Sequence, residues 1–352
     1  MGLFDRRKER NFEVERGDKE QLKPLKDLSP ENAPRRREPV KPWGRKERLF
    51  VAFVLFLTVG ISGMLSLASR SFKLPGFPRI EKPDLGLIGG EETIILGSNK
   101  ADEDKSEKAL SSFKKSTKDL SGVYGVYVIR LTDGSSYGLY QNEISQAASL
   151  IKLPILGALY KDSESGNISL DDIYTLKDED KLGGAGSLSQ QPEGYKISYK
   201  EVARLMAHDS DNTALKIIRN TLGDDKINKF IEGIGMNGTS FADNNTTPHD
   251  VGLFFQKLWE GKILNKLNTR ELLDFLTQTS YEDWLAKGLP VGVKFAHKYG
   301  REINVVNDAG IVYADQPFVM VVMSKGVVEE EADNIFPEIA KSIYGIESST
   351  KP

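Results

Sequence analysis

The chain of 352 residues contains no cysteine and only three histidines. The lack of cysteine excludes disulfides, thiolate nucleophiles and cysteine-based metal sites, and it leaves the redox compartment undetermined. Three dispersed histidines also argue against a zinc site, so we expect neither a metal nor another cofactor. The formal net charge of -3 is small for this length, and nothing in it points to a nucleic-acid partner.

Charge is also missing from residues 49–69, "LFVAFVLFLTVGISGMLSLAS". A helix of 21 residues spans a hydrocarbon core of about 30 Å, so this run predicts a single transmembrane helix. The 48 residues before it hold 15 Lys or Arg against 10 acidic residues. This excess predicts a cell-membrane protein whose N-terminus is cytoplasmic and whose remaining chain is extracytoplasmic. A signal peptide cleaved near Ser66-x-Ala68 is the alternative, but its charged leader is far too long.

The predicted span divides the chain into five parts. Residues 1–48 are charged and rich in proline, which predicts a disordered cytoplasmic tail, with a basic patch for lipid headgroups as the open alternative. Residues 70–108 are interpreted as an extracytoplasmic linker, because they are Pro/Gly-rich and then polar. Residues 109–347 form the expected folded domain, and residues 348–352 form a short tail.

Strand patterns lie at both ends of the expected domain, and helix patterns lie between them. "VYGVYVIRLTDGSSYGLYQ" predicts a hairpin that turns at Asp133-Gly134. "GVKFAHKYG", "VVNDAGIVYA" and "PFVMVVMSK" predict strands near the C-terminus. We therefore expect an α+β fold with an antiparallel sheet flanked by helices and an all-helical subdomain. The first and last helices of the domain should cover one face of the sheet.

One short motif suggests nucleophilic catalysis. In "AASLIKLPILGALY", Ser149 precedes Lys152 by three residues at a predicted helix start, where free backbone N–H groups can stabilise an oxyanion. Residues three apart share a helical face, so the lysine can reach the serine hydroxyl. Burial and the charge of Lys298 should lower the pKa of Lys152 enough for it to act as a base. The same four-residue pattern also occurs at Ser111/Lys114, Ser112/Lys115 and Ser348/Lys351.

Two later motifs distinguish the first serine-lysine pair from the other three. Ser210-Asp211-Asn212 interrupts a helix pattern within "HDSDN", which predicts a loop between two helices. Farther on, a predicted strand carries Lys298, Tyr299 and Gly300, followed by Arg301.

This order of motifs resembles the penicillin-recognising serine enzymes, and especially the class A β-lactamases. The resemblance extends from about residue 109 to residue 345 and includes "NTTPHDVG", "LTQTSYEDWLAKGLP" and "VVNDAGIVY". It implies that Ser149 is acylated, that Lys152 acts as the base and that Ser210 relays a proton. It also implies that Asn212 binds the substrate amide, that Lys298 attracts the substrate carboxylate, and that the backbone N–H groups of Ser149 and Arg301 form the oxyanion hole.

Two departures from the family pattern concern the substrate and the release step. Tyr299 stands where the family usually has Thr or Ser, whose hydroxyl helps to bind the substrate carboxylate, so we expect a different substrate pocket, with a Tyr299 hydroxyl directed at the ligand as the alternative. No glutamate lies between Gly233 and Pro248, where the family's Ω-loop supplies the base for deacylation. Asp243 is the only acidic residue of that segment, and it is a weak candidate to replace the missing glutamate as the base.

The expected function is that of a membrane-anchored serine hydrolase that β-lactams or related peptidic amides acylate at Ser149. Hydrolysis of the resulting acyl-enzyme is expected to be slow. The alternatives are a D-Ala-D-Ala peptidase that acts on cell-wall stem peptides, and a non-catalytic envelope module that binds peptidoglycan or a partner. The oligomeric state is not predicted.

Other motif matches carry less weight. The glycines 233, 235 and 238 match a dinucleotide-binding pattern but follow a helix, so we predict a turn there. Ser136 is flanked by glycines as in an esterase elbow, but it lies in the predicted hairpin. His208, His249 and His297 each adjoin a family motif, which favours structural roles for all three.

Overall fold

The computed structural model describes residues 44–71, 93–97 and 100–349. Nearly all of the predicted cytoplasmic tail and residues 72–92 of the predicted linker lie outside these ranges. The chain divides into two compact units, residues 1–60 and 61–352.

The first unit contains most of α1 (Arg45–Ser71). The residues it shares with the uncharged run are helical, and large side chains such as Phe50, Phe53 and Phe56 are exposed. Among the described residues, no helix combines the length and the mean hydropathy that a membrane crossing requires. The predicted transmembrane helix is therefore not supported by the structure.

The second unit is built around one six-stranded antiparallel sheet with the strand order β1-β3-β2-β10-β9-β8. Its strands are β1 (Thr93–Leu96), β2 (Val123–Arg130), β3 (Ser136–Leu139), β8 (Lys294–Glu302), β9 (Val305–Tyr313) and β10 (Phe318–Lys325). Two small two-stranded sheets pair β4 (Ser145–Gln146) with β7 (Asn245–Thr246) and β5 (Ile173–Thr175) with β6 (Lys196–Ser198). The strand β8 lies at one edge of the large sheet, so half of its backbone groups face away from β9.

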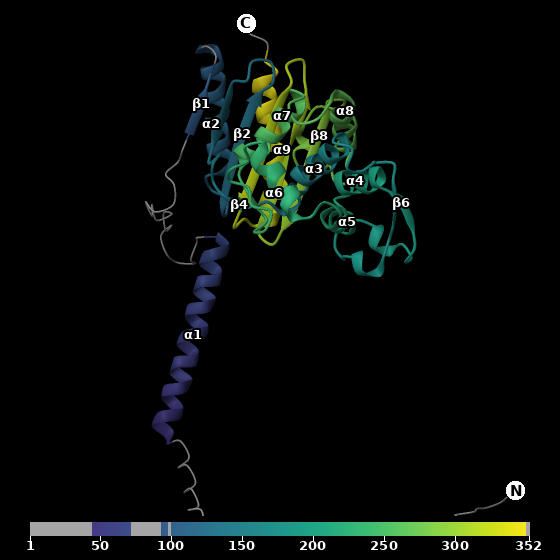
Figure 1. Ribbon diagram of the computed structural model, residues 1–352. Helices are drawn as coiled ribbons and strands as arrows, with labels where there is room; N and C mark the ends of the chain where they lie inside the picture. The colour runs from purple at the N-terminus through teal and green to yellow at the C-terminus, as the bar shows by residue number, and fades with distance from the viewer. Residues whose placement is uncertain (1–43, 72–92, 98–99, 350–352) are drawn as a thin grey trace, which may run out of the picture. The chain divides into compact units, whose positions relative to one another are not determined.

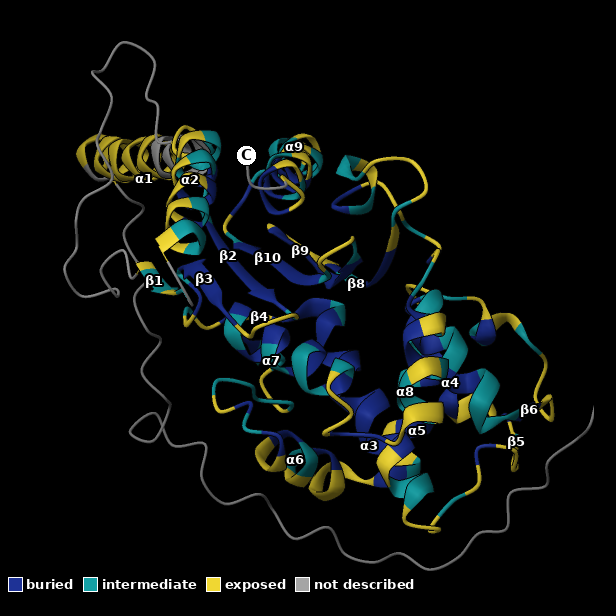
Figure 2. Cartoon of the chain, turned by 90° about the horizontal axis from the view of Figure 1, so that it is seen from above, coloured by how far each residue is buried: buried dark blue, intermediate teal, exposed yellow. Residues whose placement is uncertain are grey.

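Helices cover both faces of the large sheet (Figures 1 and 2). One face is covered by α2 (Lys100–Thr117) and α9 (Glu329–Glu347). The other faces α7 (Pro248–Trp259) and the helical subdomain, which contains α3 (Lys152–Glu164), α4 (Tyr199–His208), α5 (Asn212–Leu222), α6 (Asp224–Gly233) and α8 (Lys266–Phe275). Short 3₁₀ turns are η1 (Ala148–Ile151), η2 (Asp178–Asp180), η3 (Leu188–Gln190) and η4 (Ala286–Gly288). The predicted α+β architecture, including the pairing of its first and last helices, is confirmed.

Alternating side chains of the central strands feed two hydrophobic cores. In β2, Val126 and Val128 belong to the core under α2 and α9, whereas Tyr127 and Ile129 belong to the core shared with the helical subdomain. This period of two places successive residues on opposite faces, and here both faces are buried. The central strands of the sheet are thereby packed on both faces.

The folded unit begins earlier than the predicted boundary at residue 109. Thr93–Leu96 pairs with β3 at the edge of the sheet, and α2 starts at Lys100. The polarity of the segment "NKADEDKSEK" predicts a linker, but most of it is helical. Two of its four acidic residues, Asp102 and Glu103, lie in the first turn of α2. The buried face of this helix is narrow and consists of Ser106, Ala109, Leu110 and Phe113.

Candidate active site

Ser149 lies in the tight turn η1, which leads directly into α3. The residue before it, Ala148, has a φ of 48°, a left-handed conformation that non-glycine residues rarely adopt. Asn307 of β9 holds this turn against the sheet, because its Nδ2 donates to the carbonyl oxygens of Gln146 at 2.9 Å and Ala147 at 3.2 Å. The predicted helix start is thus confirmed, with the serine in a 3₁₀ turn just before the α-helix proper.

Lys152, the first residue of α3, is the centre of the candidate site. Its side chain is almost completely buried, and Nζ lies 3.2 Å from the Oγ of both Ser149 and Ser210. Nζ also donates to Asn212 Oδ1 at 2.8 Å and to the carbonyl oxygen of Ser210. The lysine therefore connects the serine of the first motif with both polar side chains of the second.

Burial lowers the pKa of Lys152 to about 8, against the opposing influence of the carboxylates of Asp211 and Glu302. The predicted lowering of this pKa by burial agrees with the structure, whereas the charge of Lys298, the second predicted cause, is not among the influences on Lys152. At neutral pH a useful fraction of this amine is unprotonated. An unprotonated amine at this distance can accept a proton from a serine hydroxyl.

The loop between α4 and α5 presents Ser210, which has a φ of 56°. Asp211 fixes this loop from inside, since Oδ1 accepts from the N–H of Ala214 and Oδ2 accepts from the N–H of Leu188, both at 2.8 Å. A capped helix start on one side and a second loop on the other leave little freedom for Ser210. The helix break predicted at "HDSDN" is confirmed.

A glycine-rich loop that the sequence analysis missed holds the same corner. The N–H of Asn212 donates to the carbonyl of Ala185 at 3.0 Å, and its Nδ2 donates to the carbonyl of Gly183 at 3.1 Å. Gly186 has a φ of 92°, and a Cβ built there would lie 2.0 Å from Asp211 Oδ2. Glycine is required at this position by both its conformation and the close approach. The cluster of glycines in "GGAG" was the available signal.

Edge strand β8 approaches the serine through Gly300. A Cβ on this residue would lie 2.8 Å from the backbone nitrogen of Ser149. The N–H of His297 points away from β9, since it donates to the carbonyl of Leu276 at 2.7 Å. N–H groups two and four residues along a strand point the same way, so that of Arg301 also faces outward. Two backbone donors therefore lie where the strand and η1 meet.

The side chain of Arg301 is directed elsewhere. Its guanidinium pairs with Asp333 of α9 at 2.6 Å and lies 5.0 Å from the ring centroid of Trp284. The side chain of Arg301 therefore lies with α9 and Trp284, while its backbone N–H faces outward from β8.

Lys298 is fully buried on β8. Its Nζ donates to the carbonyl oxygen of Tyr299 at 3.2 Å and lies 4.1 Å from the centroid of that ring. Burial, followed by the charge of Lys152, holds the pKa of Lys298 well below its usual range, and Asp308 and Asp209 oppose this shift. The charge of Lys152 thus acts on Lys298, although the Lys298 ammonium is hydrogen-bonded to the backbone of Tyr299.

Tyr299 is tied to the wall of the site. Its hydroxyl shares a hydrogen bond of 3.0 Å with Ser280 Oγ, and Ser280 in turn donates to the carbonyl of His208 at the end of α4. The ring packs at 5.3 Å from Tyr281 and 6.3 Å from Trp284. The phenol therefore belongs to a fixed aromatic wall, and burial raises its pKa.

Behind this wall His297 lies between two carboxylates. Its Nδ1 is 2.7 Å from Asp308 Oδ1, and its Nε2 is 3.1 Å from Glu282 Oε1. Burial alone would lower the pKa of His297, but Asp308 and Glu282 outweigh it and raise that pKa to about 9. Asp308 also accepts from the N–H of Leu285 at 3.0 Å. The cluster fastens the segment of residues 279–285 to β8.

The remaining candidates lie apart from this arrangement. Asp243 is exposed and accepts from Ser240 Oγ at 2.7 Å. Ser136 is in β3, within the predicted hairpin, and the glycine pattern around residue 235 follows α6 as a turn. His208 and His249 lie beside the carboxylates of Asp209 and Asp250.

Comparison with known proteins agrees with this geometry. Residues 107–346 match a family described as "Beta-lactamase enzyme family". A structure of PBP-A is 27% identical, covers 68% of this chain and 95% of its own, and superposes with a TM-score of 0.65. A β-lactamase from Sphaerobacter thermophilus is 21% identical, covers 70% and 99%, and also has a TM-score of 0.65. No curated protein sequence is significantly similar to the chain.

The fold is that of the penicillin-recognising serine hydrolases. The chain belongs to the β-lactamase enzyme family, as a class A-like serine hydrolase.

Proposed function

We propose that Ser149 is the nucleophile of this hydrolase and that β-lactams or related peptidic amides acylate it. The observation that carries this proposal is the position of Lys152, a buried amine of lowered pKa within 3.2 Å of both serine hydroxyls. A mutant of the similar PBP-A has been solved as an acyl-enzyme complex with penicillin G, at 27% identity and a TM-score of 0.62.

In the proposed acylation, neutral Lys152 takes the proton of Ser149 while Oγ attacks the amide carbonyl carbon. The backbone N–H groups of Ser149 and Arg301 stabilise the oxyanion that forms. When the tetrahedral intermediate collapses, the carbon–nitrogen bond breaks and the nitrogen receives a proton through Ser210, which Lys152 replenishes. Asn212 and Lys298 orient the substrate, as the resemblance implies.

Release of the acyl group is proposed to be slow. Hydrolysis needs a base within hydrogen-bond reach of a water beside the ester. The segment between α6 and α7 contains no glutamate, and its one carboxylate, Asp243, is exposed and bonded to Ser240. The acyl-enzyme should therefore accumulate, as in a penicillin-binding protein.

Incubation with penicillin G followed by intact-mass measurement tests both steps. We expect one adduct of the mass of penicillin G that decays over hours and is absent from Ser149→Ala. An adduct that persists in Ser149→Ala would refute the assignment of the nucleophile, and decay within seconds would refute slow release. In a parallel reaction with a stem peptide, release of D-alanine would identify the substrate as a cell-wall peptide.

We also propose that the domain is attached to the outer face of a cell membrane. This proposal rests on the sequence alone, namely the uncharged run of residues 49–69 and its basic flank. Extraction of a membrane fraction with alkaline carbonate tests it. Full-length protein should stay with the lipid, and a chain that begins at residue 93 should be released.

A further inference from the structure

A cavity lies on the helical subdomain, between α3, α6 and the segment that follows α7. Its volume is about 390 Å³, within the range of small-molecule sites. The residues that line it are Ala158, Lys161, Asp162, Ser165, Lys226, Lys229, Phe230, Gly233, Ile234, Lys262 and Ile263. None of the residues of the candidate active site is among them. We call this cavity the α3–α6 pocket.

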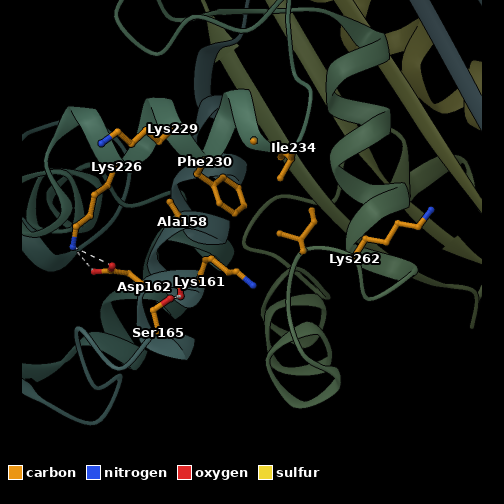
Figure 3. A pocket seen from close by; sticks show the side chains of 11 residues that line it. Ala158, Lys161, Asp162, Ser165, Lys226, Lys229, Phe230, Ile234 and Lys262 are labelled. Atoms are coloured by element: carbon orange, nitrogen blue, oxygen red, sulfur yellow. Dashed lines mark hydrogen bonds and ion pairs between the residues drawn. The ribbon is translucent and has the colours of Figure 1, made fainter.

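The apolar part of the pocket is built by close packing against α3. A Cβ at Gly157 would lie 2.5 Å from the ring of Phe230, so the glycine lets this ring lie directly on the helix. Ala158, Ile234 and Ile263 add aliphatic surface around it. Figure 3 shows the Phe230 ring and the Ile234 side chain among the residues that line the pocket. Such a surface favours an apolar ligand body.

The polar part of the pocket is strongly unbalanced in charge. Four lysines line it against one carboxylate, Asp162, which is already engaged. Both of its oxygens accept from Lys226, at 2.8 and 3.0 Å, and Asn167 donates to one of them at 2.7 Å. Asp162 therefore neutralises Lys226, and Lys262 pairs at 2.6 Å with Glu260, which does not line the pocket.

Lys161 is the cation best placed to receive an anion. Its ammonium is 3.5 Å from Glu164, a weak contact, and 54% of its side chain is exposed. Glu164 Oε1 meanwhile accepts from the N–H of Asn265 and from Nδ2 of Asn268, at 2.7 and 2.9 Å. In Figure 3 the Lys161 amine extends into the space next to Phe230. A carboxylate there would gain a charge-assisted hydrogen bond beside an apolar floor.

We propose that the α3–α6 pocket binds a small amphiphile with a single carboxylate, a free medium-chain fatty acid, with its chain over Phe230 and Ile263 and its carboxylate at Lys161. A phosphate is a poorer match, because no arginine lines the pocket to hold it in two-fold fashion. The proposal is independent of the acylation of Ser149.

Calorimetric titration of the full chain with sodium decanoate, below the concentration at which micelles form, tests this inference. We expect saturable binding of one decanoate, weakened about tenfold in Lys161→Gln because one ion pair is lost. Lys266→Gln, an exposed change on α8, should bind like the wild type. Ser149→Ala should also bind normally, which separates this pocket from the candidate active site.

The head group and the chain are tested separately with two ligands of equal length. Decanol and decyltrimethylammonium should both bind at least tenfold more weakly than decanoate. Equal binding of the cationic amphiphile would overturn the proposal, because it would show adsorption through the chain alone. Absence of saturable binding, or an unchanged affinity in Lys161→Gln, would overturn it as well.

Discussion

The two sides of the candidate active site are built in different ways. The helical side, residues 147–152 and 208–212, brings the amine of Lys152 to within 3.2 Å of two hydroxyls. On the sheet side, residues 277–285 and 294–302, the polar groups are hydrogen-bonded to one another. Lys298 donates to the backbone of Tyr299, and the Tyr299 hydroxyl is bonded to Ser280. The side that performs the proposed proton transfers is assembled, whereas the side that would recognise a carboxylate is occupied by its own contacts.

This difference separates chemistry from recognition. Acylation depends on pKa values and on distances of about 3 Å, and the helical side meets both conditions. Recognition of the substrate depends on Tyr299, which replaces the usual Thr or Ser and packs against Tyr281 and Trp284. We therefore expect changes on the helical side to abolish acylation and changes on the sheet side to alter stability or substrate choice.

The largest effect is expected from Lys152→Met, which removes the amine and roughly preserves the volume. Loss of a general base should slow acylation by penicillin G about 10²- to 10⁴-fold. The rate of adduct formation, followed by intact mass, measures it, and Lys266→Met serves as the matched surface control. A rate within threefold of the wild type would show that another group takes the proton of Ser149.

The pH dependence of the wild type checks the same assignment. Neutral Lys152 is the reactive form, and its pKa is lowered to about 8. The acylation rate should therefore rise with pH, about tenfold per unit below this pKa, and level off above it. A rate that falls between pH 6 and pH 8 would contradict the role of Lys152 as base.

On the sheet side, His297→Gln should cost stability in a pH-dependent manner. The folded-state pKa of about 9 lies above the unfolded value of 6.5, so the stabilisation is complete below pH 6.5 and is lost as pH rises through 9. A pKa shift of this size corresponds to a contribution of roughly 3 kcal/mol to the free energy of unfolding at low pH. Urea unfolding at pH 6 and pH 9.5 measures it. His249→Gln, at a half-exposed histidine, is the control, and an equal loss in both variants at both pH values would disprove the buried ion cluster.

Gly186→Ala tests how rigidly the helical side is held. The new Cβ would overlap the side chain of Asp211, the residue between Ser210 and Asn212 that caps the N-terminus of α5. We expect the free energy of unfolding to fall by roughly 2 kcal/mol and acylation to become slower. Gly194→Ala provides the control, since Gly194 has a φ of 84° but no atom within 4 Å of its Cβ. Equal losses in the two variants would mean that backbone strain, and not the contact with Asp211, is responsible.

Much of this arrangement could be predicted from the sequence, because the signals were local. The turn at Asp133-Gly134, the helix start at Ser149 and the polar interruption at 208–212 each have a signal in the nearby sequence. These local conformations place Ser149 at a helix start and Ser210 in a loop. That the three motifs meet in one site was inferred from their order, which resembles that of the class A β-lactamases.

The rest depends on contacts between residues distant in sequence, for which a single chain carries no local signal. Gly186 meets Asp211, and Tyr299 meets Ser280, only after the sheet and the helical subdomain have packed. The strand β1 was missed for the same reason, since four residues pair with β3 across a stretch of about 40 positions. The low apolar content of residues 100–108 hid the N-terminal half of α2, whose buried face is narrow.

The smallest effect is expected at the residue that distinguishes the sheet side most. Tyr299→Thr restores the family's usual hydroxyl and removes the ring over which Lys298 Nζ lies at 4.1 Å. Freed from the ring, Lys298 should bind a substrate carboxylate better, so acylation by penicillin G should accelerate about tenfold, the equivalent of one charge-assisted contact. Tyr299→Phe keeps the ring and loses only the bond to Ser280, so it should leave this rate nearly unchanged. Equal acceleration in both variants would mean that the Ser280 contact, and not the ring, restrains recognition. With the methyl ester of penicillin G as substrate the advantage of Tyr299→Thr should disappear, because the ester presents no carboxylate to Lys298.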